Sequence, residues 1–423
     1  MNITNMITNL LKKKSIKNGA WLYLLQIFNT VVPLLTLPYV TRILGAEKYG
    51  IFAIAINIIG YYQVIVEYGF MMSATRKVAL SEKSEYMLSK TFSTVFFSRC
   101  FLLSVCFIIT LGYIVVNRKN VSQCLCLIIL MIGLLGSCIQ LNWLFQGMQQ
   151  MKYITIVNVV ARICTVLLTF IFVHSINDLY LYCLLYSISP VISGFLGLIF
   201  AAKCFRIHFV KVGILDIVEE IKNGWYVFTT QLSSKVFGAI GITLLGCFST
   251  SRDVGIYSAI QKIPNIIILA WSPITQVLYP ISSQKFQESY EIGKKFVNKT
   301  KKIFVPIFLG IAIVGSIMSP TIVEVAFGKE YVAKFYWIIP LLLWMVTAIY
   351  NNFAGIQTLL AGGYDREYSK CFQVGVIVTI VLNFVLVYFL KGNGACLAPL
   401  FSEIILGIML KKEVWKLEKN KKL

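Results

Sequence analysis

The stretch TRILGAEKYGIFA, Thr41 to Ala53, is a short polar interruption between two long apolar runs. It places two glycines, one acidic residue and two basic residues within a few positions. Glycine tolerates the positive φ values that other residues avoid, so the hexamer GAEKYG is typical of a turn. The nature of the two flanking runs then decides the fold.

The composition identifies these runs as membrane helices. Of the 423 residues, 58% are hydrophobic and 13% are charged, and the mean hydropathy is +0.77. A soluble domain carries about one quarter charged residues, and a helix needs about 20 apolar residues to cross a bilayer core. The sequence predicts an all-α, polytopic membrane protein of about twelve spanning helices with no soluble domain. The predicted spans cover approximately residues 19 to 42, 50 to 72, 88 to 116, 121 to 145, 151 to 174, 178 to 203, 222 to 248, 254 to 282, 302 to 327, 335 to 361, 369 to 390 and 394 to 411.

The net charge of +21 would indicate a nucleic-acid partner in a soluble chain. In this chain the position of the basic residues gives another reason for the charge. With the N-terminus inside, 27 basic residues fall at cytoplasmic ends of the spans and 8 at outer ends, as the positive-inside rule requires. We therefore expect both termini in the cytoplasm and no nucleic-acid partner.

Signatures of catalysis and of metal binding are missing from the sequence. The eleven cysteines lie mostly in apolar runs without a CxxC motif, and the chain has two histidines. We find no GxxxxGK[ST] loop, no GxSxG elbow and no HExxH motif. The sequence thus predicts a protein that is not an enzyme, with no metal and no cofactor.

The opening turn has a counterpart in the second half of the chain. A shift of 205 residues aligns Asn18-Gly19 with Asn223-Gly224, Gln26 with Gln231, and Gly50-Ile51 with Gly255-Ile256. The turn then falls on TSRDVGIYSA, and six intervening spans make the two halves parallel repeats. We expect two six-helix lobes, 1–203 and 222–423, joined by a cytoplasmic connector, 204–221, that forms a helix on the inner surface.

Charges inside predicted spans are the main candidates for function, because a charge in the bilayer is costly and usually faces a protein interior or an aqueous cavity. The four intramembrane bases are Arg99, Arg162, Lys235 and Lys262. Snorkelling to the interface or pairing with an acid are the alternatives. An excess of positive charge in a cavity suits an anionic substrate. The acids Glu67 and Glu403 are either partners of these bases or sites of ion coupling.

Amide side chains inside the spans are candidates for contacts with sugars. The candidates are Gln26, Asn29, Asn57, Gln63, Asn142, Gln231, Asn351, Asn352 and Gln357. Hydrogen bonding between helices is the alternative role for all of them.

Two stretches resemble a known family. PYVTRILGAEKYGIFAIAINIIGYYQVIVEYGFMMSATRKVA, Pro38 to Ala79, and WLFQGMQQMKYITIVNVVAR, Trp143 to Arg162, are similar to the polysaccharide transporters. These are the O-antigen and capsule repeat-unit flippases often called Wzx, in the superfamily of the multidrug-and-toxin extruders (MATE) and the lipid II flippases. The chain lacks the two extra helices usual in lipid II flippases, which counts against that branch.

The resemblance implies a MATE-like fold in which two six-helix lobes surround a cavity that opens alternately to each side. It implies a substrate, an undecaprenyl-pyrophosphate-linked oligosaccharide, moved to the outer leaflet of the bacterial cytoplasmic membrane for O-antigen, capsule or a related surface polysaccharide. Family members tend to have a cationic lumen, which Arg99, Arg162, Lys235 and Lys262 would supply here. The expected partners are membrane lipids, a polymerase with its chain-length machinery, and H⁺ or Na⁺ for coupling.

Other functions stay open at this point. A multidrug or cation antiporter of the MATE branch would prefer an acid-rich cavity, whereas this chain has more bases than acids within its spans. A membrane polysaccharide polymerase or glycosyltransferase would need catalytic side chains on a sizeable aqueous loop, and the predicted outer loops are short. A structural scaffold gives no reason to bury bases in several helices.

Overall fold

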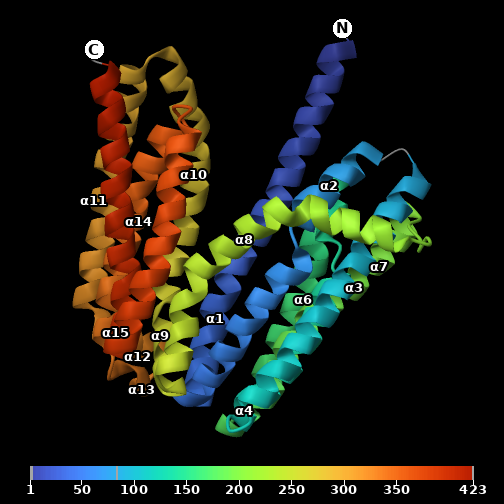
Figure 1. Ribbon diagram of the computed structural model, residues 1–423, viewed down its shortest axis with the longest axis horizontal. Helices are drawn as coiled ribbons and strands as arrows, with labels where there is room; N and C mark the ends of the chain where they lie inside the picture. Colours follow the sequence, from blue (N-terminus) through green and yellow to red (C-terminus); the bar gives the residue numbers. More distant parts are fainter. Residues whose placement is uncertain (1–2, 82–83, 422–423) are drawn as a thin grey trace. The chain divides into compact units, whose positions relative to one another are not determined.

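The computed structural model describes residues 3–81 and 84–421, and the regular structure within these ranges is entirely helical (Figure 1). The chain divides into two compact units. Unit 1 comprises Met1–Thr36 and Ile54–Lys235, and unit 2 comprises Leu37–Ala53 and Val236–Leu423. The segment that contains the GAEKYG turn thus belongs to unit 2. The lobe boundaries at 203 and 222 stay a prediction.

In unit 1, α7 packs along both α4 and α6. Its helices, with α1 and α8 continuing into unit 2, are α1 (Ile3–Glu67), α2 (Phe70–Ser81), α3 (Glu85–Val116), α4 (Val121–Ile139), α5 (Asn142–Gly147), α6 (Met151–Phe172), the short η1 (Ile176–Asp178), α7 (Leu179–Phe205) and the start of α8 (Ile214–Phe248).

In unit 2, α14 packs along α15, and α11 packs against both α10 and α14. The helices that follow α8 are α9 (Ser251–Ile260), α10 (Lys262–Glu288), α11 (Tyr290–Ile317), α12 (Ser319–Phe327), α13 (Lys329–Val332), η2 (Phe335–Trp337), α14 (Ile338–Ala354), the π-helical η3 (Gly355–Leu360) and α15 (Asp365–Lys421).

The turn predicted at GAEKYG is confirmed as a break inside α1. Gly45 has φ 69° and ψ 172°, a conformation that is essentially restricted to glycine. A second interior break lies in α15, where Lys391 has φ 51° and ψ −125°. Both long helices therefore consist of two helical segments joined at a sharp bend.

Ten helical ranges among the described residues are long and apolar enough to cross a membrane. Two of them, Lys17–Leu80 and Asp365–Lys419, contain 64 and 55 residues and include the breaks at Gly45 and Lys391. A single crossing takes about 20 residues, so each of these ranges is long enough for two. The all-α polytopic class is confirmed, and the count of twelve stays a prediction.

The connector was expected to be helical over 204–221, and this expectation is wrong for residues 206–213. Arg206 ends α7 in the left-handed conformation, at φ 52°, and residues 206–213 are not helical. Residues 214–221 form the first turns of α8 instead. The carboxylate of Asp216 accepts a hydrogen bond from the backbone N–H of Gly213 at 3.0 Å, which stabilises the start of α8 at that point.

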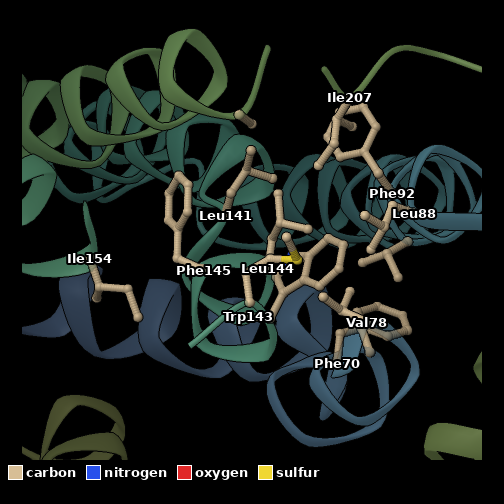
Figure 2. Close-up of a cluster of buried hydrophobic side chains, with 14 of the residues drawn as sticks. Phe70, Val78, Leu88, Phe92, Leu141, Trp143, Leu144, Phe145, Ile154 and Ile207 are labelled. Atoms are coloured by element: carbon tan, nitrogen blue, oxygen red, sulfur yellow. The ribbon is translucent and has the colours of Figure 1, made fainter. Parts of the chain in front are cut away.

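A buried apolar cluster in unit 1 fixes the short helix α5 (Figure 2). Trp143, Leu144 and Phe145 are all fully or almost fully buried there, and Trp143 lies beside Val78 and Phe70 of α2. A six-residue helix has little stability of its own, so this packing determines its position. It fixes the adjacent polar residues Gln140 and Asn142 at the break between α4 and α5.

Candidate functional site

A polar cavity of about 310 Å³ lies within unit 1 and is surrounded by α1, α4, α5, α6 and α7. Its lining residues are Asn29, Ile56, Ile59, Gln63, Glu67, Leu130, Gly133, Ser137, Gln140, Asn142, Asn158, Arg162, Tyr186, Ser187, Ser189 and Pro190. Five residues predicted from the sequence meet here: Asn29, Gln63, Glu67, Asn142 and Arg162.

Arg162 is the only basic residue that lines this cavity among the described residues. The guanidinium carbon of Arg162 lies 5.5 Å from the ring centroid of Tyr186, within range of a cation–π contact. Among the described residues, no carboxylate oxygen lies within 4.0 Å of this guanidinium. The planar donors of Arg162 are therefore available to an anion that enters the cavity.

Amide groups hold the polar wall of the cavity in place. Gln63 Nε2 donates to Glu67 Oε1 at 2.8 Å along α1. Asn158 Nδ2 donates to Asn142 Oδ1 at 3.2 Å, which joins α6 to α5. The side chains of this wall can donate and accept hydrogen bonds, as sugar hydroxyl groups require.

The predicted set omitted three of the polar residues in this wall: Gln140, Asn158 and Tyr186. A signal for one of them was present in the sequence. Asn158 precedes Arg162 by four residues, so the two share one helical face. No comparable spacing marks Gln140 or Tyr186.

Arg99 is buried and does not itself line this cavity, although it contacts Gln140, which does. Its side chain is 4% exposed, and Nη1 donates to the backbone carbonyl of Gln140 at 2.8 Å. The Gln140 carbonyl has no partner within the helix, because α4 ends at Ile139. A cation at a helix C-terminus is favourable, since it compensates the unsatisfied carbonyls there. The hydrogen bond to Gln140 therefore holds Arg99 at the break between α4 and α5.

Lys235 and Lys262 lie elsewhere. The ammonium of Lys235 is 5.6 Å from the ring centroid of Tyr61 and lies against Gly60 of α1, but Lys235 does not line the cavity. Lys262 is exposed at the first residue of α10 in unit 2. Of the four predicted bases, Arg162 alone lines the polar cavity of unit 1.

The remaining predicted amides do not line this cavity. Gln26 is exposed, Asn57 is buried and Gln231 is half-buried, and none of the three lines the cavity. Asn352 lies in unit 2, where its Oδ1 accepts a hydrogen bond from Thr275 Oγ1 at 2.6 Å. For Asn352 the observed role is a contact between α14 and α10.

Glu403 is buried in unit 2, at 6% exposure, and is bonded to α14. Asn351 Nδ2 donates to the Glu403 backbone carbonyl at 2.7 Å and to Oε1 at 3.0 Å. Glu403 and Glu67 are thus in different environments, and Glu67 alone of the two lines the polar cavity of unit 1.

The fold and this cavity define a class of protein. Helices long enough to span a membrane, with polar and ionisable groups gathered in a cavity between them, are the architecture of a membrane transport protein. Solved structures with the same fold include the lipid II flippase MurJ in an inward closed conformation. That match has a TM-score of 0.74 at 12% identity and covers 94% of this chain and 87% of MurJ. An inward-facing MATE family transporter of the MOP superfamily matches with a TM-score of 0.68 at 12% identity, over 92% of this chain and 96% of that one.

The chain belongs to the polysaccharide biosynthesis protein family, whose pattern it matches over residues 15–286. Two relatives both carry the name "Putative O-antigen transporter". The one from Escherichia coli K12 is 26% identical over 397 residues, which cover 93% of this chain and 95% of the relative. The one from Shigella dysenteriae is 28% identical over 408 residues, which cover 94% of this chain and 99% of the relative.

Proposed function

We propose that the protein is a flippase that moves undecaprenyl-pyrophosphate-linked oligosaccharide from the inner to the outer leaflet of the bacterial cytoplasmic membrane. The proposal rests above all on Arg162, a guanidinium without a carboxylate partner in a cavity whose wall is otherwise rich in amides. Names of relatives that refer to O-antigen transport support the polysaccharide pathway. The MurJ-like fold is consistent with a lipid-linked substrate.

The cavity has two kinds of polar side chain, the guanidinium of Arg162 and the amides, and each binds a different part of the substrate. The pyrophosphate meets Arg162, because guanidinium groups bind phosphate oxygens through paired, charge-assisted hydrogen bonds. The sugars meet Asn29, Gln140 and Asn142, while the lipid tail stays in the bilayer. Alternating access of the cavity to the two sides then carries the head group across.

Glu67 gives the same cavity a group that is able to couple transport to an ion. It lies in the wall with Arg162 and accepts a hydrogen bond from Gln63. Binding of H⁺ or Na⁺ at this carboxylate changes the net charge of the cavity by one unit and thereby alters its attraction for the pyrophosphate.

The test is transport of a defined lipid-linked oligosaccharide in proteoliposomes by the Arg162→Gln variant. Hydrogen bonds to a charged group contribute about 1.5–3 kcal/mol, so we expect transport to fall by about tenfold or more. Arg162→Lys keeps the charge and should retain part of the activity. The matched control is Arg118→Gln, which removes an exposed arginine outside the helices.

Full transport by Arg162→Gln at normal protein levels would contradict the role of Arg162. A drug or cation antiporter is the second candidate, and the Glu67 carboxylate in the cavity is the observation that favours it. It predicts that Glu67→Gln abolishes export of a cationic dye in the same vesicles, whereas the flippase predicts no export of the dye by the unaltered protein.

A further inference from the structure

A second cavity with basic walls lies in unit 2, between α11, α14, η3 and α15. It has a volume of about 190 Å³. The walls from α11 and α15 follow the same helical spacing: Lys294, Val297, Asn298 and Lys301 on α11, and Lys411, Val414, Trp415 and Glu418 on α15. Positions i, i+3, i+4 and i+7 form one helical face, so each helix turns a mixed basic and apolar face into the cavity.

One of the three lysines is neutralised, and the other two are not. Lys294 Nζ lies 2.9 Å from Glu418 Oε1. The ammoniums of Lys301 and Lys411 lie 5.3 Å and 4.7 Å from the ring centroid of Tyr350. No carboxylate among the described residues lies within 4.0 Å of either ammonium.

The ring of Tyr350 therefore has two ammonium groups close to it. Because both ammoniums are measured from the same ring centroid, they are at most 10.0 Å apart. Two like charges so close repel each other, and an anion between them would remove the repulsion. The arrangement suits a ligand with one or more phosphate groups.

The surroundings point to a lipid as the source of the phosphate. Trp415 is 61% exposed at the edge of the cavity, and the ammonium of Lys419 lies 5.6 Å from its ring centroid. Exposed tryptophan beside lysine near the end of a spanning helix is typical of the interface between the bilayer core and the head groups. Basic pockets between membrane helices bind the head groups of anionic lipids.

We propose that this cavity binds the phosphate head group of an anionic membrane lipid through Lys301 and Lys411. The inference does not depend on the flippase function, because the cavity lies in unit 2 and shares no lining residue with the polar cavity of unit 1. Its test measures binding and not transport.

The experiment uses the full-length protein, purified in detergent, and native mass spectrometry with added phosphatidylglycerol or phosphatidylcholine. We compare Lys301→Gln/Lys411→Gln with the control Lys302→Gln/Lys412→Gln. The control lysines are exposed neighbours on the same two helices, do not line the cavity, and give the same change in charge. Each lysine near an anionic head group is worth about fivefold in affinity, so the cavity variant should bind phosphatidylglycerol about thirtyfold more weakly. The control should match the unaltered protein.

Three results would overturn the proposal. Equal losses in the two double variants would mean that the basic helix ends attract anionic lipid without a specific site. Loss of binding in the charge-conserving variant Lys301→Arg/Lys411→Arg would show that charge is not what the cavity recognises. Competition by soluble glycerol 3-phosphate as strong as by phosphatidylglycerol would assign the cavity to a soluble phosphate ligand instead.

Discussion

Glu220, near the start of α8, has a buried carboxylate that also accepts a hydrogen bond from Ser73 Oγ at 3.5 Å. Its side chain is 2% exposed and forms an ion pair with Lys77 of α2, whose side chain is 43% exposed. The nearby pair of Lys90 and Asp216 is open to solvent on both sides, at 40% and 36% exposure. The two ion pairs connect helices of unit 1 in similar ways but differ in burial.

We predict that Lys77→Gln destabilises the protein, because it leaves the Glu220 carboxylate buried without a counter-charge. Removal of one partner from a fully buried pair costs about 3–5 kcal/mol, and the half-exposed Lys77 lowers our expectation to about 2 kcal/mol. Thermal unfolding in detergent measures the loss. Lys90→Gln is the control and should cost less than about 1 kcal/mol. Equal losses in the two variants would contradict the role of burial.

The same dependence on packing limits how far the candidate site is predictable from the sequence. Arg99 and Arg162 both appear as bases within apolar runs, yet Arg162 lines the polar cavity and Arg99 donates to the free carbonyl of Gln140. The break that exposes this carbonyl lies inside the predicted span 121–145 and depends on how Trp143 and its neighbours pack. Residue type and spacing identify the charges, but the helix contacts assign their roles.

At the scale of elements, the opening turn and its counterpart meet inside unit 2. A Cβ on Gly50 would lie 1.6 Å from the carbonyl oxygen of Ser251, and a Cβ on Gly255 would lie 1.9 Å from that of Ala46. The offset of 205 residues relates Ala46 to Ser251 and Gly50 to Gly255, so the contact is reciprocal. A reciprocal contact between equivalent positions is what the predicted internal repeat leads us to expect.

The carboxylate of Glu330 joins the same two turns. Glu330 Oε2 accepts a hydrogen bond from the backbone N–H of Ala46 at 2.9 Å, and Oε1 lies 3.5 Å from Arg252 Nε. A carboxylate at the N-terminus of a helical segment is stabilised by the helix dipole and the free N–H groups. Glu330 therefore strengthens the contact that the two glycines permit.

We predict that Gly50→Ala and Gly255→Ala each destabilise the protein by at least about 1–3 kcal/mol, because the added methyl group has to displace backbone atoms. Fluorescence-detected gel filtration after heating measures this loss. Gly310→Ala is the matched control, since a Cβ at this position in α11 meets nothing within 4 Å. Stable Gly50→Ala and Gly255→Ala variants would show that the helices are not in close contact at these positions.

At the scale of the whole molecule, the fold class followed from the composition because a bilayer leaves few alternatives. Backbone groups in hydrocarbon need partners within their own segment, so long apolar runs become helices. The interruptions at Gln140, Gln261 and Met318 were not predicted, because a span is identified by its length and mean hydropathy, and these do not show a local change in backbone direction. The turn at Gly45 was predicted because its glycines and charges break the apolar pattern.

The orientation in the membrane is the prediction that concerns the chain as a whole. Basic residues are retained on the cytoplasmic side during insertion. The predicted inner ends carry 27 basic residues, and the predicted outer ends carry 8. Green fluorescent protein fused after Leu423 should therefore fluoresce, because it folds in the cytoplasm. Alkaline phosphatase should be active when fused after Lys119, between α3 and α4, and inactive when fused after Gly213, between α7 and α8. Activity at Gly213 and none at Lys119 would reverse the orientation and place the basic cavity of Lys301 and Lys411 at the outer surface.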